Sequence, residues 1–96
     1  MTTQPTQTEL PVVRSVRHKT TAAALLALGC ELHGIRDAED GWCEIEVRVP
    51  PALDDAAQKI IGDGRGVQVE WGAFRDCLRD ISAQITEHIN ERRREQ

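Results

Sequence analysis

The chain has 96 residues, 40% of them hydrophobic and 29% charged, which suits one folded domain with a modest core. Its formal net charge of −4 argues against a general nucleic-acid binder, because such proteins usually present a basic face. No apolar run approaches the roughly 18 residues that a membrane span needs, and the polar opening residues do not resemble a signal sequence. The three cysteines, an odd number, then predict free thiols in a reducing cytoplasm.

The N-terminal stretch, residues 1–13, is polar and is interrupted by Pro5 and Pro11, which is typical of a disordered arm. It ends in Val12 and Val13, whose apolar side chains allow this end of the arm to lie along the domain in an extended form. The folded domain is expected to begin directly after it.

A first short helix is predicted from strong helix formers between Ala22 and Leu28. Thr20 or Thr21 is suited to cap its N-terminus, and Gly29 stands where a left-handed residue would end it. A helix this short is marginal alone, so its leucines must gain stability by packing.

A β-hairpin is predicted next. The strand Cys30–Arg36 is followed by a turn, Asp37–Gly41, and by the strand Trp42–Val49, in which apolar and polar residues alternate. The first strand does not alternate cleanly, and a bulge near His33–Gly34 would bring its apolar residues to one face.

A second short helix follows the hairpin, with Pro51 suited to an early helical position because its φ is fixed. Apolar residues then recur at the spacing of one helical face: Leu53, Ala56, Ala57, Ile60 and Ile61. Gly62 ends this helix. The loop Gly62–Gly66 lacks the Gly-Lys-Ser/Thr ending of a nucleotide-binding loop, so we interpret it as a flexible connector.

The stretch Val69–Arg93 predicts a long amphipathic helix, on which the rest of the chain would pack. Its apolar stripe recurs with helical spacing: Trp71, Phe74, Leu78, Ile81, Ile85 and Ile89. The predicted fold class of residues 14–96 is therefore α+β, a single domain with a short helix, a two-stranded antiparallel hairpin, a short helix and a long C-terminal helix.

This order of elements resembles a small family of bacterial and phage proteins known only as a domain of unknown function. The resemblance spans about Ser15 to Ile85 and rests on a hydrophobic pattern: Ala24, Leu25, Leu26, Gly29, Leu32, Gly34, Ile35, Ile45, Val47, Leu53, Val69, Glu70, Phe74, Leu78 and Ile81. The chain departs from the family in its second strand, where the family often carries aromatic residues. The resemblance implies a small α+β domain, often on mobile elements, and supplies no active residues.

Metal-binding and catalytic residue types are scattered along the chain. Cys30 and His33 are the closest such pair, and an unbulged strand would place them on opposite faces. Cys43 lies at an apolar strand position, Cys77 lies beside the apolar stripe of the long helix, and His88 is on that same helix. A nucleophilic cysteine needs an exposed setting and a nearby base. We therefore expect no metal site, no cofactor and no enzymatic activity.

A patch for binding a protein partner is predicted on the second strand. Glu44 and Glu46 share its outward face, and Trp42 lies beside them. The alternative is that Trp42 only covers the end of the hairpin. The resulting hypothesis is a non-enzymatic interaction protein, phage- or mobile-element-borne, that binds a host or viral protein, for example to inhibit a defence complex.

The alternative function is a small nucleic-acid-associated accessory or regulatory factor. The basic residues Arg14, Arg17 and Lys19, with the run Arg92–Arg94, would then contact nucleic acid. The ordinary interpretation of Arg92–Arg94 is a set of cations that favour the negative end of the helix.

A homodimer through the long helix is also predicted. Trp71 to Ile81 should pack within one chain, whereas Ile85 to Arg92 should project beyond what a short hairpin covers, so Ile85 and Ile89 would need a second copy. The alternative is that this end of the helix frays in solvent.

Overall fold

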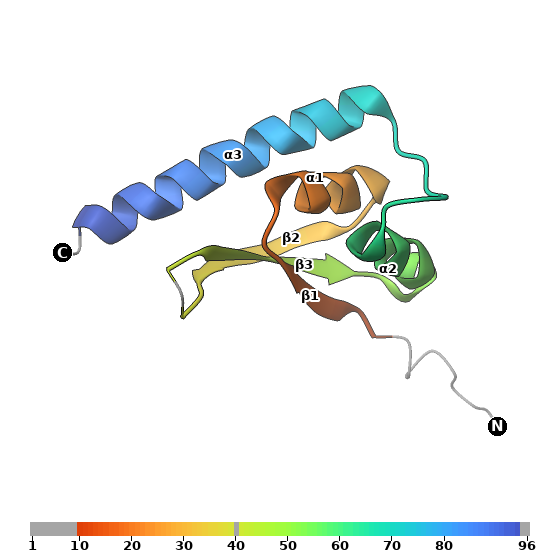
Figure 1. The fold of residues 1–96 in the computed structure, drawn as a ribbon, viewed down its shortest axis with the longest axis horizontal. Coiled ribbons are helices and arrows are strands. Elements are labelled where there is room, and N and C mark those ends of the chain that lie inside the picture. Colours follow the sequence, from red (N-terminus) through yellow and green to blue (C-terminus); the bar gives the residue numbers. More distant parts are fainter. Residues whose placement is uncertain (1–9, 40, 95–96) are drawn as a thin grey trace.

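The computed structural model describes residues 10–39 and 41–94 and places them in three layers (Figure 1). An antiparallel sheet forms one outer layer. The helices α1 (Lys19–Leu28) and α2 (Asp54–Gly62) lie on one face of that sheet, and α3 (Trp71–Arg94) lies across α1. A short 3-10 turn, Pro51–Leu53, leads into α2. The α+β class predicted from the sequence is confirmed.

The sheet differs from the predicted hairpin because, within the described residues, it has three strands. They are β1 (Val12–Val16), β2 (Glu31–Asp37) and β3 (Cys43–Val49), in the order β1-β3-β2 with antiparallel neighbours. The valine-rich β1 pairs with the edge of β3 that the hairpin leaves open, as a segment of high β-propensity can. Val12 and Val13, which the prediction placed in a disordered arm, thus belong to a strand, and residues 1–9 of the predicted arm lie outside the described residues.

The predicted bulge in β2 is confirmed at His33. Leu32 pairs with Val47 and Gly34 pairs with Glu46, so His33 is an extra residue without a place in the ladder. The extra residue shifts the alternation by one position, which allows Leu32 and Ile35 to share the core side of the strand.

Helix α1 begins earlier than the threonine caps suggested. His18 has extended backbone angles and occupies the N-cap position without a side-chain hydrogen bond, so the prediction of Thr20 or Thr21 as the cap is wrong. The predicted end at Gly29 is confirmed, with a φ of 127°. The backbone N–H groups of Gly29 and Cys30 donate to the carbonyl oxygens of Leu26 and Leu25, which satisfies the last turn of the helix.

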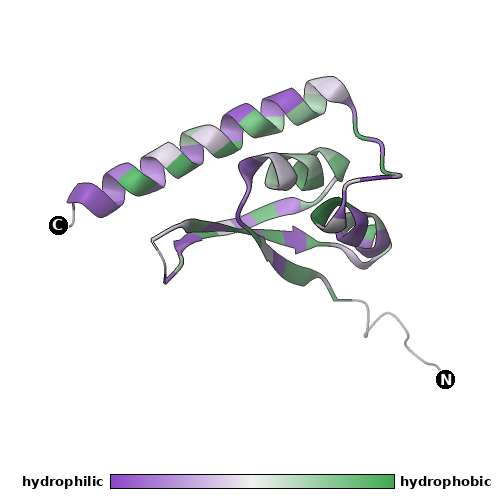
Figure 2. Cartoon of the chain, in the orientation of Figure 1, coloured by the Kyte–Doolittle hydropathy of each residue, from purple (hydrophilic) through white to green (hydrophobic). Residues whose placement is uncertain are grey.

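The core lies on both sides of α1. Ala22, Ala23 and Leu25 are fully buried, as are Val47 in the central strand and Ile81 on α3. In Figure 2 most of α1 is hydrophobic, whereas hydrophobic and hydrophilic turns alternate along α3. A helix that is apolar on opposite sides is expected to be sandwiched, and small alanines let its neighbours approach closely.

Helix α3 packs on α1 through Ile81 and through half-buried neighbours on the same face: Phe74, Cys77, Leu78 and Ile85. Trp71 does not join them. It stays 68% exposed and stacks on Phe74 with ring centroids 5.7 Å apart. The prediction that Trp71 packs inside the protomer is therefore wrong, because side chains of the first helical turn lean toward the N-terminus and away from the rest of the face.

Arg14 on β1 ties the added strand to α2. Its Nε and Nη2 donate to Oδ1 of Asp54 at 3.1 and 2.8 Å. Hydrogen bonds from Arg14 and then from Gln58 hold the pKa of the Asp54 carboxyl below its usual value of 3.8. The ion pair thus fastens the outer strand at the point where α2 begins.

Stability should depend on pH through Asp54. A carboxyl whose pKa is lowered on folding contributes stability above its unfolded pKa, and this contribution is lost as the pH falls through the folded pKa. Asp54→Asn is therefore expected to weaken the loss of stability below about pH 4. Urea midpoints measured from neutral to acidic pH test this. The neighbouring exposed Asp55→Asn is the control, and equal pH profiles for the two variants would contradict the expectation.

Candidate functional site

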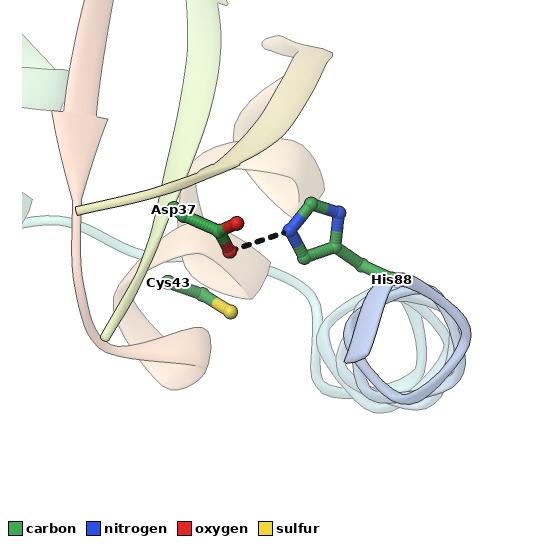
Figure 3. Close-up of side chains that lie close together, drawn as sticks. All are labelled: Asp37, Cys43 and His88. Atoms are coloured by element: carbon green, nitrogen blue, oxygen red, sulfur yellow. Dashed lines mark hydrogen bonds and ion pairs between the residues drawn. The ribbon is translucent and has the colours of Figure 1, made fainter. Parts of the chain in front are cut away.

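The end of the hairpin and the last turns of α3 meet in a polar cluster (Figure 3). Asp37 ends β2 and is paired in register with Cys43, the first residue of β3. Between them, the backbone N–H of Ala38 donates to the carbonyl oxygen of Trp42 at 2.7 Å and closes the turn. This pairing sets the two side chains next to each other, pointing toward α3.

His88 on α3 completes the cluster. Its Nε2 lies 2.9 Å from Oδ1 of Asp37, and Nη1 of Arg92, one helical turn later, donates to the same oxygen at 2.9 Å. These hydrogen bonds, that of His88 first, lower the pKa of Asp37 below its usual value. The expectation that Ile85 to Arg92 projects beyond the hairpin is therefore wrong, since His88 and Arg92 hold this part of α3 against the end of β2.

The cluster brings together residues that the sequence analysis treated separately. One ligand atom each from Asp37, Cys43 and His88 lies within 4.8 Å of the others. The other candidates are elsewhere: Cys30 is buried in the link between α1 and β2, and His33 faces Arg48 on the open side of the sheet. The sequence analysis missed Asp37 because it assigned this residue to the turn. The hairpin register, which sets position 37 opposite position 43, is the signal that would have found it.

The cluster does not have the arrangement of a catalytic cysteine with its base. In such a pair one histidine nitrogen takes the thiol proton while the other is held by a carboxylate. Here Nε2 of His88 faces Asp37, and the same side of the ring faces Cys43 (Figure 3). One nitrogen cannot serve both residues in those two roles.

A groove adjoins the cluster, between the hairpin end and α3, with a volume of about 270 Å³. Its apolar lining comes from Trp42, Ile85 and Ile89, and basic residues line it as well: Arg17, Lys19 and Arg92. A second hollow of about 280 Å³ shares Arg17 and Trp42 with it. The indole of Trp42, 65% exposed, therefore belongs to a concave surface with a basic rim.

The predicted acidic patch has a different character in the structure. Glu44 and Glu46 do lie on the open face of the sheet, but Arg36 bonds both, at 2.6 Å to Oε1 of Glu44 and 3.0 Å to Oε2 of Glu46. Arg17 adds a contact of 3.7 Å to Glu44. Each of these carboxylates thus has an arginine partner. Of the basic residues that line the groove, Arg17 is paired with Glu44 and Arg92 with Asp37, and Lys19 adds a further positive charge.

The basic residues proposed for nucleic-acid contact do not form one surface. Arg14 lies on the helix-covered side of the sheet and is engaged by Asp54, whereas Arg17 and Lys19 line the groove. Arg93 and Arg94 are exposed in the last turn of α3. Of the basic residues that the sequence suggested, Arg17, Lys19 and Arg92 therefore line the groove, whereas Arg94 lines a hollow on another face of α3.

Comparisons of the chain with protein-family models, with curated proteins and with solved structures find no match. The resemblance to a bacterial and phage family stays a prediction. Among the helices of the described residues, none combines the length and apolar character that crossing a membrane requires.

Proposed function

We propose that the chain is a non-enzymatic interaction protein whose groove at the hairpin end binds an acidic, amphipathic segment of a protein partner. The observation that carries the proposal is the pairing of an exposed tryptophan with a concave apolar lining and a basic rim. Partly exposed aromatic residues in a pocket are the typical anchors of protein interfaces.

The basic residues around the groove favour a partner segment that carries negative charge. The chain as a whole carries a net charge of −4, yet Arg17, Lys19 and Arg92 line this groove. A segment with apolar residues on one side and carboxylates on the other would bury the first against Trp42 and Ile89 and set the second against the rim. A binding role for a host or viral protein, including inhibition of a defence complex, is compatible with such a surface.

A synthetic acidic amphipathic peptide tests the proposal. The Trp71→Phe variant leaves Trp42 as the remaining tryptophan of the chain and makes its fluorescence a local probe. Binding should shift the emission of Trp42 to shorter wavelength as the indole leaves water. Ile89→Lys in the same background should weaken binding about 10- to 100-fold, because one buried aliphatic side chain is worth about 1.5–3 kcal/mol.

The matched control is Ala83→Lys, which introduces the same residue at an exposed position of the same helix. Equal losses in Ile89→Lys and Ala83→Lys, or no emission shift, would contradict the proposed site. Titration with single-stranded DNA forms the second arm. Binding of DNA in place of peptide, with affinity that falls steeply as salt rises, would favour the nucleic-acid-associated factor instead.

A second copy of the chain is the other occupant to be tested. Ile85 packs against the core of its own chain and Ile89 lines the groove, so a seam through both would be narrower than the sequence suggested. Light scattering at micromolar concentration distinguishes a groove that binds a different protein from one that binds a second copy of the chain. The mass of one chain, 10.7 kDa, leaves the groove to a partner, whereas twice that mass, reduced to one chain by Ile89→Lys, would assign it to a homodimer.

A further inference from the structure

We propose that Asp37, Cys43 and His88 bind a divalent transition metal, with zinc as the best fit, where the hairpin end meets α3. Carboxylate oxygen, thiolate sulfur and imidazole nitrogen are the atoms with which proteins hold zinc. One such atom from each of the three residues lies within 4.8 Å of the other two. Figure 3 shows the three side chains converging from two strands and a helix on one small space.

The spacing requires little rearrangement. Zinc bonds of about 2.0–2.3 Å in a tetrahedral site place ligand atoms roughly 3.3–3.8 Å apart. Nε2 of His88 and Oδ1 of Asp37, 2.9 Å apart, need to separate slightly, and no pair of ligand atoms is farther apart than 4.8 Å, so the Cys43 sulfur needs to approach by about 1 Å at most. The backbones of Asp37 and Cys43 are fixed as register partners, so the adjustment falls to the side chains. Asp37 is 44% exposed, so a water molecule can fill the fourth position.

The charges of the ligands themselves suit a divalent ion. The Asp37 carboxylate and the Cys43 thiolate together balance the charge of Zn²⁺. On binding, the thiol proton and any second proton on His88 pass to solvent, and metal bonds replace the hydrogen bond between His88 and Asp37. Arg92 can stay on the Asp37 carboxylate, as outer partners of ligating carboxylates do.

A bound metal would account for the position of the half-buried Cys43 thiol beside Asp37 and His88. The Asp37 hydrogen bonds to His88 and Arg92 would hold α3 to the hairpin without Cys43. A bound metal uses all three and joins β2, β3 and α3 at one point. This inference does not depend on the function proposed for the groove.

Titration of the reduced full-length chain with Co²⁺ alone tests the site. Binding should produce a sulfur-to-cobalt charge-transfer band together with the visible absorption of tetrahedral cobalt, and added Zn²⁺ should abolish both. Cys43→Ser should remove the charge-transfer band. His88→Ala should lower the affinity by about 100-fold or more, since loss of outer partners alone costs 10- to 100-fold.

The matched controls are Cys77→Ser and His33→Ala, which remove the same residue types outside the cluster. Both should bind Co²⁺ as the unchanged chain does. Absence of the charge-transfer band in the unchanged chain would overturn the proposal. Its persistence in Cys43→Ser, or its loss in Cys77→Ser, would do the same. Circular dichroism of every variant confirms that it is folded when it is titrated. Because no peptide is present, failure here leaves the test of the groove unaffected.

Discussion

Replacing Ile81 with alanine is expected to lower the free energy of unfolding by about 2–5 kcal/mol, the range for aliphatic side chains removed from a core. Ile81 is fully buried on α3, which packs on α1, and the fully buried residues of α1 include Ala22 and Ala23. Alanine side chains have no rotamers with which to fill the space that the isoleucine leaves, so the cavity should persist and the loss should lie toward the upper part of the range.

Urea unfolding of the variant gives the measurement, and Ile61→Ala gives the matched control. Ile61 belongs to the predicted apolar face of α2 but is 39% exposed in the structure, so its truncation should cost less than about 1 kcal/mol. Similar losses for the two isoleucines would mean that α3 does not pack on α1 in solution as described.

Gly29→Ala should also destabilise the fold strongly, by about 1–3 kcal/mol, the cost of holding a residue with a Cβ in a disfavoured backbone region. Gly29 has a φ of 127°, and a Cβ placed there would lie 3.2 Å from Cδ1 of Leu53. Backbone strain and a close contact thus add together at the end of α1.

Two further variants separate these causes. Gly41 has a φ of 87° with no atom within 4 Å of an added Cβ, so Gly41→Ala reports strain without the contact and should cost less than Gly29→Ala. Combining Gly29→Ala with Leu53→Ala should cost less than the sum of the single changes, because the second removes the atom that the first approaches. Strict additivity in thermal unfolding would show that the contact contributes nothing.

Local signals in the sequence predicted the elements well where a single residue determines the backbone. Gly29 ends α1, Gly41 supplies the positive φ of the hairpin turn, and the bulge at His33 follows from the broken alternation of β2. The missed third strand depends on a long-range pairing, since Val12 meets Val49 across the intervening helix and hairpin. The residues around Val12 carry no local signal that identifies β3 as the pairing strand, and Pro5 and Pro11 favoured the prediction of a disordered arm.

The candidate site was less accessible to sequence reasoning than the fold. Trp42 was identified as a surface residue, yet its neighbours in the groove are Ile85 and Ile89 on α3. Their proximity depends on how α3 crosses α1, which the helical period does not specify. For the same reason the sequence placed Glu44 and Glu46 in an open acidic patch and could not show that Arg36 neutralises them.

Because α1 lies between α3 and the sheet, α3 and the sheet are expected to differ in how easily each opens from the native state. β3 is hydrogen-bonded on both sides, whereas α3 is joined to the rest mainly through α1 and the Asp37 hydrogen bonds. Partial opening of the native state should therefore release α3 first and expose the apolar outer side of α1, while the sheet persists. A chain in that state would expose apolar surface of α1, through which two copies could associate. Because the hydrogen bonds of Asp37 hold α3 in place, they would also limit self-association of the folded protein.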